Sequence, residues 1–238
     1  MFLNGPSATR RTFLSALLNS CLGACLALTT AAAGMSSATA QTVSAEARAR
    51  PVILVVGDSL SAEYGLPRGT GWVQLLVERL RGSGFDYTVA NSSISGETTS
   101  GGRTRLPSLL QEHRPRIVII ELGANDGLRG LPLAAMRDNL AAMVRAAQSA
   151  KASVLLVGVR VPPNYGRDYA ERFAATYGSI AKELRVPLTP FLLDGFAESL
   201  DYFQQDRIHP NEAAQSRMLD NVWRELRPML AGKAVSSR

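Results

Sequence analysis

Pro51-Val52-Ile53-Leu54-Val55-Val56-Gly57-Asp58-Ser59-Leu60-Ser61 is the stretch from which the fold can be worked out. Its first part, Val52–Val56, is an unbroken apolar run rich in valine and isoleucine, bounded by Pro51 and Gly57. Such a run predicts a strand that is buried on both faces. Ser59 then lies just past the carboxyl end of this strand, where open parallel sheets place their ligands, and is a candidate nucleophile.

Strand-like and helix-like patterns alternate along the rest of the chain. We expect further strands at Tyr87–Ala90, Ile117–Leu122, Val154–Val159 and, shorter, Pro187–Phe191. Helical patterns cover Gly71–Arg81, Thr98–Glu112, Leu133–Ala150, Tyr169–Arg185 and Asn211–Leu230. This alternation predicts an α/β fold, a three-layer α/β/α sandwich with a flavodoxin-like, five-stranded parallel sheet. No repeat or second domain is visible in the sequence, so residues 41–238 are expected to form one domain.

Polar segments follow the predicted strands at their carboxyl ends. They contain Ser59, then Asn91–Gly96, then Gly123–Asp126, and finally Asp206 and His209. In a doubly wound sheet such loops converge on one edge. The sequence therefore predicts that four segments far apart along the chain meet at one place.

Residues 1–40 are typical of an export signal. Arg10 and Arg11 precede an uncharged stretch, and Ala38-Thr39-Ala40 fits a small-x-small cleavage site. The arginine pair also resembles a twin-arginine signal, which would mean transport of a folded chain. Two alternatives stay open, namely an uncleaved membrane anchor and lipidation of Cys25 within the lipobox-like Leu22–Cys25. We expect a periplasmic or secreted protein, with membrane contact only through a retained or lipidated leader.

Composition limits the partners and the chemistry. Both cysteines, Cys21 and Cys25, lie in the leader, so a chain cleaved after Ala40 has no disulfide, no cysteine-based zinc site and no thiolate nucleophile. Cleavage removes two arginines and no acid, which lowers the formal net charge from +6 to +4. The remaining arginines are scattered without interleaved aromatic residues, which favours a solvated surface over a nucleic-acid site. We expect a monomer that acts on small molecules.

Only two histidines are candidates for a general base. His113 precedes the predicted strand Ile117–Leu122 and is therefore expected at the amino end of the sheet, away from Ser59. His209 stands three residues after Asp206, so that one turn brings both side chains to the same side. The carboxylate can then orient the imidazole, whose other nitrogen faces the serine. The alternative is that Asp206 caps a turn and Pro210 starts the last helix.

Acyl transfer by a serine also requires donors for the oxyanion. Gly96 offers a backbone N–H that no Cβ obstructs, and Asn125 offers a side-chain amide at the next strand end. Together with the N–H of Ser59, these would form an oxyanion hole, in which each donor contributes about 3 kcal/mol of transition-state stabilisation. The alternatives are that Gly96 only permits a turn and that Asn125 only closes a loop.

The surroundings of Ser59 differ from the Gly-x-Ser-x-Gly elbow of α/β-hydrolases, because Ser61 occupies the last position. Gly-Asp-Ser-Leu, a lone glycine, Gly-x-Asn-Asp and a late Asp-x-x-His together resemble the SGNH (GDSL) hydrolase family. The longer strings Ser93–Thr98, Glu121–Gly130 and Asn164–Arg167 look like its bacterial periplasmic thioesterase/lysophospholipase/arylesterase branch. The resemblance covers Pro51 to about Leu226. It implies a triad of Ser59, Asp206 and His209, and an oxyanion hole of Ser59, Gly96 and Asn125.

The resemblance also implies the reaction and its substrates. We expect a serine esterase that cleaves aryl esters, short to medium acyl esters, thioesters and lysophospholipids through an acyl-serine, without a metal or organic cofactor. Pro163, Asn164 and Tyr165 follow the fourth predicted strand and correspond to a substrate-responsive loop in the family; the alternative is a plain helix-entry loop. Asp58 is expected to cap the following helix.

Two other functions are weighed against the esterase. The same scaffold carries carbohydrate O-deacetylases. A non-catalytic, flavodoxin-like binding module would instead use this sheet edge for a phosphate or a nucleotide. Against the binding module, the junction after Val52–Val56 lacks both Gly-x-x-x-x-Gly-Lys and Gly-x-Gly-x-x-Gly.

Overall fold

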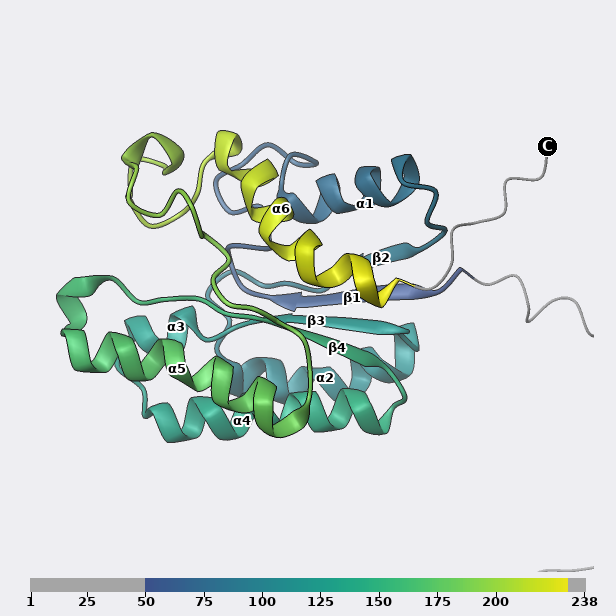
Figure 1. Cartoon of the computed structure of the whole chain (residues 1–238), viewed down its shortest axis with the longest axis horizontal. Helices are drawn as coiled ribbons and strands as arrows, with labels where there is room; N and C mark the ends of the chain where they lie inside the picture. Colours follow the sequence, from purple (N-terminus) through teal and green to yellow (C-terminus); the bar gives the residue numbers. More distant parts are fainter. Residues whose placement is uncertain (1–49, 231–238) are drawn as a thin grey trace, which may run out of the picture. The chain divides into compact units, whose positions relative to one another are not determined.

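A five-stranded, fully parallel sheet forms the centre of the fold (Figure 1). The structure is a computed structural model that describes residues 50–230. The strands are β1 (Val52–Gly57), β2 (Thr88–Asn91), β3 (Ile117–Glu121), β4 (Ser153–Val157) and β5 (Leu188–Thr189). Their order across the sheet is β2-β1-β3-β4-β5, and every neighbouring pair is parallel. The predicted fold class is confirmed.

Helices cover both faces of the sheet, which gives three layers (Figure 1). On one face, α1 (Trp72–Gly82) packs against α6 (Gln215–Leu226). On the other face, α4 (Leu133–Ser149) packs between α2 (Thr99–His113) and α5 (Arg167–Leu184). The shorter elements are α3 (Ala124–Leu128) and the 3₁₀ turns η2 (Pro163–Tyr165), η3 (Leu200–Tyr202), η4 (Glu212–Ala214) and η5 (Arg227–Met229).

The core lies between these layers because the central strands are apolar on both sides. Every residue of β3 is buried, and so are the last five residues of β1. Helix α1 contributes Trp72, Leu76 and Leu80, which are spaced by four residues and share one helix face. Each large apolar side chain buried in this way contributes about 1.5–3 kcal/mol relative to exposure. The sheet is therefore a rigid base for the loops at its carboxyl edge.

Two predicted elements are corrected. The helix expected at Asn211–Leu230 is divided into η4, α6 and η5. Its α-helical part ends at Leu226, two residues before Pro228, which has no N–H to continue the helical hydrogen bonds. The strand expected at Pro187–Phe191 is only Leu188–Thr189, because prolines stand directly before and after these two residues.

The strand order places the topological switch point between β1 and β3. The chain leaves β1 toward β2 and then crosses back to β3, so that the loops after β1 and β3 diverge to opposite faces. A crevice at such a point is the usual ligand site of open α/β sheets. None of the helices in residues 50–230 is long and apolar enough to cross a membrane. The leader expected at residues 1–40 lies outside the described residues.

Candidate active site

Three side chains form a hydrogen-bonded series at the carboxyl edge of the sheet. Ser59 follows β1, and its Oγ lies 3.0 Å from Nε2 of His209, which is 150 residues further along the chain. The other ring nitrogen, Nδ1, lies 2.6 Å from Oδ2 of Asp206. The structure thus brings together the predicted nucleophile, base and orienting acid, with the imidazole between the hydroxyl and the carboxylate.

The loop that carries Asp206 and His209 is folded around the carboxylate. Oδ1 of Asp206 accepts hydrogen bonds from the backbone N–H groups of Ile208 and His209, at 2.9 and 3.0 Å. Burial alone would raise the pKa of Asp206, but these N–H groups and the imidazole outweigh it, and the pKa lies below its usual value. The carboxylate therefore stays ionised beside His209. Asp206 both caps this turn and contacts the imidazole, so the two alternatives for this residue are compatible.

Asp58 joins the turn that carries Ser59 to the first turn of α3. Its side chain is fully buried, and Oδ2 accepts a hydrogen bond of 3.1 Å from the side-chain amide of Asn125. Burial raises the pKa of Asp58 to about 6, although the hydrogen bonds from Leu60 and Asn125 and the nearby His209 oppose the rise. The amide of Asn125 has a second N–H that this bond does not use. Asp58 thereby fixes the orientation of a predicted oxyanion donor.

The expectation that Asp58 caps the following helix is wrong. Its Oδ1 accepts the N–H of Leu60 at 3.0 Å, which caps the turn that presents Ser59. The next helix, α1, begins only at Trp72, and its preceding residue is Gly71. Asp58 thus acts as a turn cap next to the predicted nucleophile.

A second buried acid, Glu121, contacts the turn that carries Ser59. It is the last residue of β3, and its Oε2 accepts the hydroxyl of Ser61 at 2.7 Å and the N–H of Asp58 at 3.4 Å. Burial, and then the charge of Asp58, raise the pKa of Glu121 well above its usual value. A Cβ on Gly57 would lie 2.8 Å from Oε2 of Glu121, so the strand end fits against this acid only as glycine.

The two remaining oxyanion candidates, Gly96 and Asn125, lie in segments that hydrogen bonds join together. Gly96 follows β2, and its carbonyl accepts a hydrogen bond of 2.9 Å from Arg129, which comes directly after α3. Asn125 is in the first turn of α3, not in a loop. The neighbouring Asp126 accepts the N–H of Thr99, at the start of α2, at 2.9 Å. These bonds join the segments of Gly96 and Asn125 at the edge where Ser59 lies.

The segment predicted to bind substrate packs against the same region. Pro163 and Asn164 begin η2, and the hydroxyl of Tyr165 donates to the carbonyl of Leu128, the last residue of α3, at 3.2 Å. Asn164 and Tyr165 are both exposed. The loop after β4 therefore lies next to the helix that carries Asn125.

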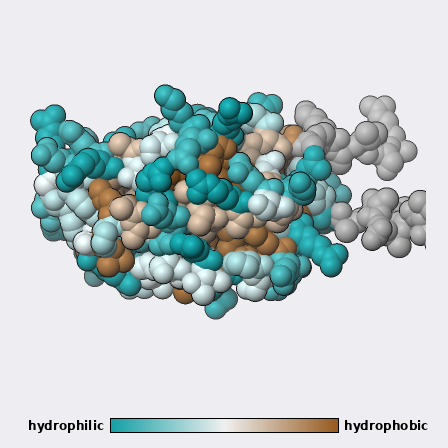
Figure 2. Space-filling model, turned by 90° about the horizontal axis from the view of Figure 1, so that it is seen from below, coloured by the Kyte–Doolittle hydropathy of each residue, from teal (hydrophilic) through white to brown (hydrophobic). Residues whose placement is uncertain are grey.

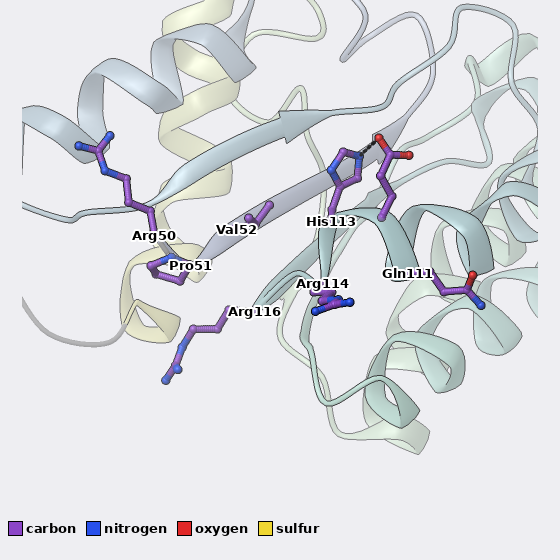
Figure 3. Close-up of a pocket in the computed structure, with 8 residues that line it drawn as sticks. Arg50, Pro51, Val52, Gln111, His113, Arg114 and Arg116 are labelled. Atoms are coloured by element: carbon purple, nitrogen blue, oxygen red, sulfur yellow. Dashed lines mark ion pairs between the residues drawn. The ribbon is translucent and has the colours of Figure 1, made fainter. Parts of the chain in front are cut away.

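His113 lies at the opposite edge of the sheet, as expected. It is the last residue of α2, and its ring lies 3.8 Å from the carboxylate of Glu112 (Figure 3). The hollow beside it is also lined by arginines, whose side chains point in different directions (Figure 3). The backbone N–H of Arg116, three residues after His113, donates a hydrogen bond to the carbonyl of Val52 at the start of β1. His113 is thus separated from Ser59 by the length of a strand.

Exposed large apolar side chains occur in the segments that follow the strands of the sheet. In residues 50–230, the large hydrophobic side chains that stand exposed all follow the carboxyl ends of strands: Tyr64, Ile94, Leu131, Tyr165, Leu200 and Ile208. Each of the five strands is followed by at least one of them. The face seen from below instead shows separate hydrophobic areas within a mixed surface (Figure 2). An apolar rim at the carboxyl edge suits a substrate with an apolar part.

Two residues at the site were not predicted from the sequence. The ring of Tyr64 lies against that of His209, and the side chain of Gln204 bonds to the backbone of Tyr64. No local pattern identifies such contacts, because Gln204 and Tyr64 are 140 residues apart.

Among the described residues, no group of three or more His, Cys, Asp or Glu side chains is placed to hold a metal ion.

The chain is similar to a family of hydrolases and to individual esterases and thioesterases. The GDSL-like Lipase/Acylhydrolase family matches residues 55–217. Esterase TesA of Pseudomonas aeruginosa is 50% identical over 182 residues, which cover 76% of this chain and 90% of that protein. Thioesterase 1/protease 1/lysophospholipase L1 of Escherichia coli K12 is 40% identical over 184 residues, covering 77% and 87%.

A solved structure extends the agreement to three dimensions. The psychrotrophic esterase EstA from Pseudoalteromonas sp., inhibited by monoethylphosphonate, superposes with a TM-score of 0.71 at 40% identity. The match covers 74% of this chain and 97% of that one. Because the family matches most of its length, the chain belongs to the GDSL-like lipase/acylhydrolase family.

Proposed function

We propose that this protein is a serine esterase that hydrolyses carboxylic esters and thioesters through an acyl-serine intermediate. The observation that carries the proposal is the unbroken series from Oγ of Ser59 through the ring of His209 to Asp206. A base within hydrogen-bond reach of a hydroxyl, itself oriented by a carboxylate, is the arrangement that activates a serine. The named relatives, which are esterases and a thioesterase/lysophospholipase, support the same reaction.

In the first half of the reaction, Ser59 is acylated. Nε2 of His209 takes the hydroxyl proton while Oγ attacks the carbonyl carbon of the substrate. The imidazolium formed is stabilised by Asp206, which stays ionised because its pKa is low. When the tetrahedral intermediate collapses, the bond to the leaving oxygen or sulfur breaks, and His209 gives this atom the proton.

Three hydrogen-bond donors are proposed to stabilise the negative charge that develops on the carbonyl oxygen. They are the backbone N–H groups of Ser59 and Gly96 and the second N–H of the Asn125 amide. The bond from Asn125 to Asp58 supports this assignment, because it fixes the amide before substrate binds. Donors fixed in advance need no reorganisation as charge develops.

In the second half, water releases the acyl group. His209, again neutral, takes a proton from a water molecule whose oxygen attacks the acyl carbon. The ester bond to Oγ then breaks, the proton returns to Ser59, and a carboxylic acid leaves. Each turnover consumes one water molecule per ester bond and requires no oxidant or reductant.

The substrates that we propose are aryl esters, short to medium acyl esters and lysophospholipids. The apolar rim formed by Ile94, Leu131, Tyr165, Leu200 and Ile208 supports substrates with an apolar acyl or aryl part. Pro163, Asn164 and Tyr165 are proposed as one wall of this region. No described contact favours an acetylated carbohydrate or a nucleotide, and the relatives named above give the deacetylase and the binding module no support.

We also propose that the chain is exported through residues 1–40 and acts as a monomer on small-molecule substrates in the periplasm or outside the cell. The sequence of the leader supports this proposal. Expression of the full chain, followed by fractionation and intact-mass measurement, tests it. A periplasmic species that begins at Gln41 is the expected product, and a full-length or lipidated species would contradict cleavage after Ala40.

Covalent labelling tests the proposed nucleophile independently of turnover. Incubation with a p-nitrophenyl alkylphosphonate should release p-nitrophenol and add one phosphonyl group per chain, located by peptide mass spectrometry on Ser59. Ser59→Ala should not be labelled, His209→Ala should be labelled at least 100-fold more slowly, and His113→Ala should react like the wild type. Labelling of another residue, or equal rates in His209→Ala and the wild type, would overturn the assignment.

A further inference from the structure

An aromatic ring covers one face of the imidazole in the proposed triad. The ring centroids of Tyr64 and His209 are 4.3 Å apart, and the ring planes are inclined by 38°. Tyr64 comes five residues after Ser59, in the turns that follow β1. The residue is 48% exposed, so burial in the core does not hold its side chain in place.

Gln204 supplies the link that burial does not. Its Nε2 donates to the carbonyl of Tyr64 at 2.8 Å and to that of Pro210 at 3.1 Å. Its backbone N–H donates to the carbonyl of His209 at 2.8 Å. One residue therefore bonds to the segment that carries the aromatic ring and to the segment that carries the imidazole.

The neighbouring glycine fits this link closely. Gly65 has a φ of +70°, and a Cβ built on it would lie 2.0 Å from Oε1 of Gln204. Any larger residue would push the amide away from the carbonyl of Tyr64. The turn after β1 and the side chain of Gln204 are thus fitted to each other across 140 residues of sequence.

We propose that Tyr64 and Gln204 are positioning residues for His209. The bond to Asp206 fixes Nδ1 but leaves the ring free to tilt about that bond, because the terminal torsion of histidine is broad. The face of Tyr64 restricts this tilt, which keeps Nε2 directed at Ser59, and Gln204 holds Tyr64 in place. The electron-rich face also favours the imidazolium that forms when Ser59 loses its proton. The inference rests on the proposed esterase function.

Substitutions of Tyr64 and Gln204 distinguish this role from that of a contact that only stabilises the fold. If the contact only linked two loops, breaking it would lower the free energy of unfolding. The loss would then be the same whether or not an aromatic ring remained at residue 64. A positioning role predicts that Tyr64→Phe, which keeps the ring, behaves like the wild type. Tyr64→Leu, which keeps an apolar side chain but no ring, should lower kcat. Gln204→Met keeps the length of the side chain but loses the N–H donor. It should also lower kcat, because the ring of Tyr64 is then no longer held against His209.

Steady-state kinetics on p-nitrophenyl butyrate, with melting curves, test the proposal. We expect Tyr64→Leu and Gln204→Met each to lower kcat about tenfold at similar KM, with Tyr64→Phe within twofold of the wild type. The double variant should lose little more than either single variant, because both changes free the same imidazole. Assays are run well below the melting temperature of every variant, so that a loss of stability alone leaves kcat unchanged.

Three results would overturn the proposal: wild-type kcat in Tyr64→Leu, an equal loss in Tyr64→Phe, or single losses that multiply in the double variant. Failure of the esterase function itself looks different, because the wild-type protein would then turn over no ester.

Discussion

The carboxylate of Asp58, the residue before Ser59, accepts a hydrogen bond of 3.1 Å from the side-chain amide of Asn125. The turn that carries Ser59 and the helix after β3 therefore share a partly buried contact at the topological switch point of the sheet. Because Asp58 also caps the turn that presents Ser59, one side chain positions both the proposed nucleophile and a proposed oxyanion donor.

Asp58→Asn tests this coupling. The asparagine side chain cannot accept hydrogen bonds with both of its terminal atoms, so it would retain the bond from Leu60 or the bond from Asn125, but not both. We expect kcat on p-nitrophenyl butyrate to fall about tenfold in Asp58→Asn and about 100-fold in Asn125→Ala. The combined variant should fall no further than Asn125→Ala alone. Losses that multiply in the combined variant would show that the two residues act separately.

The pKa of Asp58 predicts a stability difference that changes with pH. Its pKa is raised from 3.8 to about 6 in the folded protein, so the folded state binds the proton more tightly than the unfolded chain. The contribution to stability is present below about pH 4 and is lost as pH rises to about 6, a total of roughly 3 kcal/mol. Urea unfolding of the wild type and Asp58→Asn between pH 4 and 7 measures it. The difference between the two reports the titration of Asp58 together with its effect on Glu121, and equal pH slopes would contradict the assignment.

Glu121 should tolerate loss of its charge but not loss of its side chain. Burial and Asp58 raise its pKa, so the neutral acid is the favoured form, and glutamine has nearly the same shape. We expect Glu121→Gln to change the free energy of unfolding by less than about 1 kcal/mol, and Glu121→Ala to lower it by about 2–4 kcal/mol, because Ser61 loses its buried acceptor and a cavity remains. Urea unfolding at pH 7 distinguishes them. Equal losses in both variants would contradict a neutral Glu121.

Gly57→Ala tests the close packing of the strand end on Glu121. The new Cβ would lie 2.8 Å from both Glu121 and Ser61, and we expect about 1–3 kcal/mol of destabilisation by urea unfolding. Gly178→Ala, in the interior of α5 with no atom within 4 Å of the new Cβ, is the matched control. It should stabilise the protein by about 0.5–1 kcal/mol. Unchanged stability in Gly57→Ala would mean that the loop yields easily.

The sheet and the meeting of Ser59, Asp206 and His209 were predictable because both follow from simple patterns. Buried parallel strands are continuous apolar runs, and their carboxyl ends share one edge, so each polar segment after a strand falls in the same place. The spacing from Asp206 to His209 is local and reads directly from the sequence. Two of the elements that differed lie where proline intervenes, at Pro228 in the last helix and around the short strand β5, whereas the short helix α3 (Ala124–Leu128) carried no separate sequence signal.

The contacts that support the site were not predictable. Gln204 and Tyr64 are ordinary polar and aromatic residues, and their meeting depends on how two loops 140 residues apart fold over the sheet edge. Asp58 stands where a helix cap is expected, but its second carboxylate oxygen reaches Asn125 only because β1 and β3 are neighbours. Sequence periodicity describes elements, whereas these side chains act between elements.

Hydrolysis of p-nitrophenyl esters across acyl lengths, by residues 41–238 and by three variants, shows whether Ser59 and His209 carry the esterase reaction. We expect turnover by the wild type and His113→Ala, and a loss of at least 1,000-fold in kcat for Ser59→Ala and His209→Ala. The acyl length with the highest kcat/KM then defines the extent of the apolar rim. Full activity in Ser59→Ala or His209→Ala, or no ester hydrolysis by the wild type, would contradict this expectation.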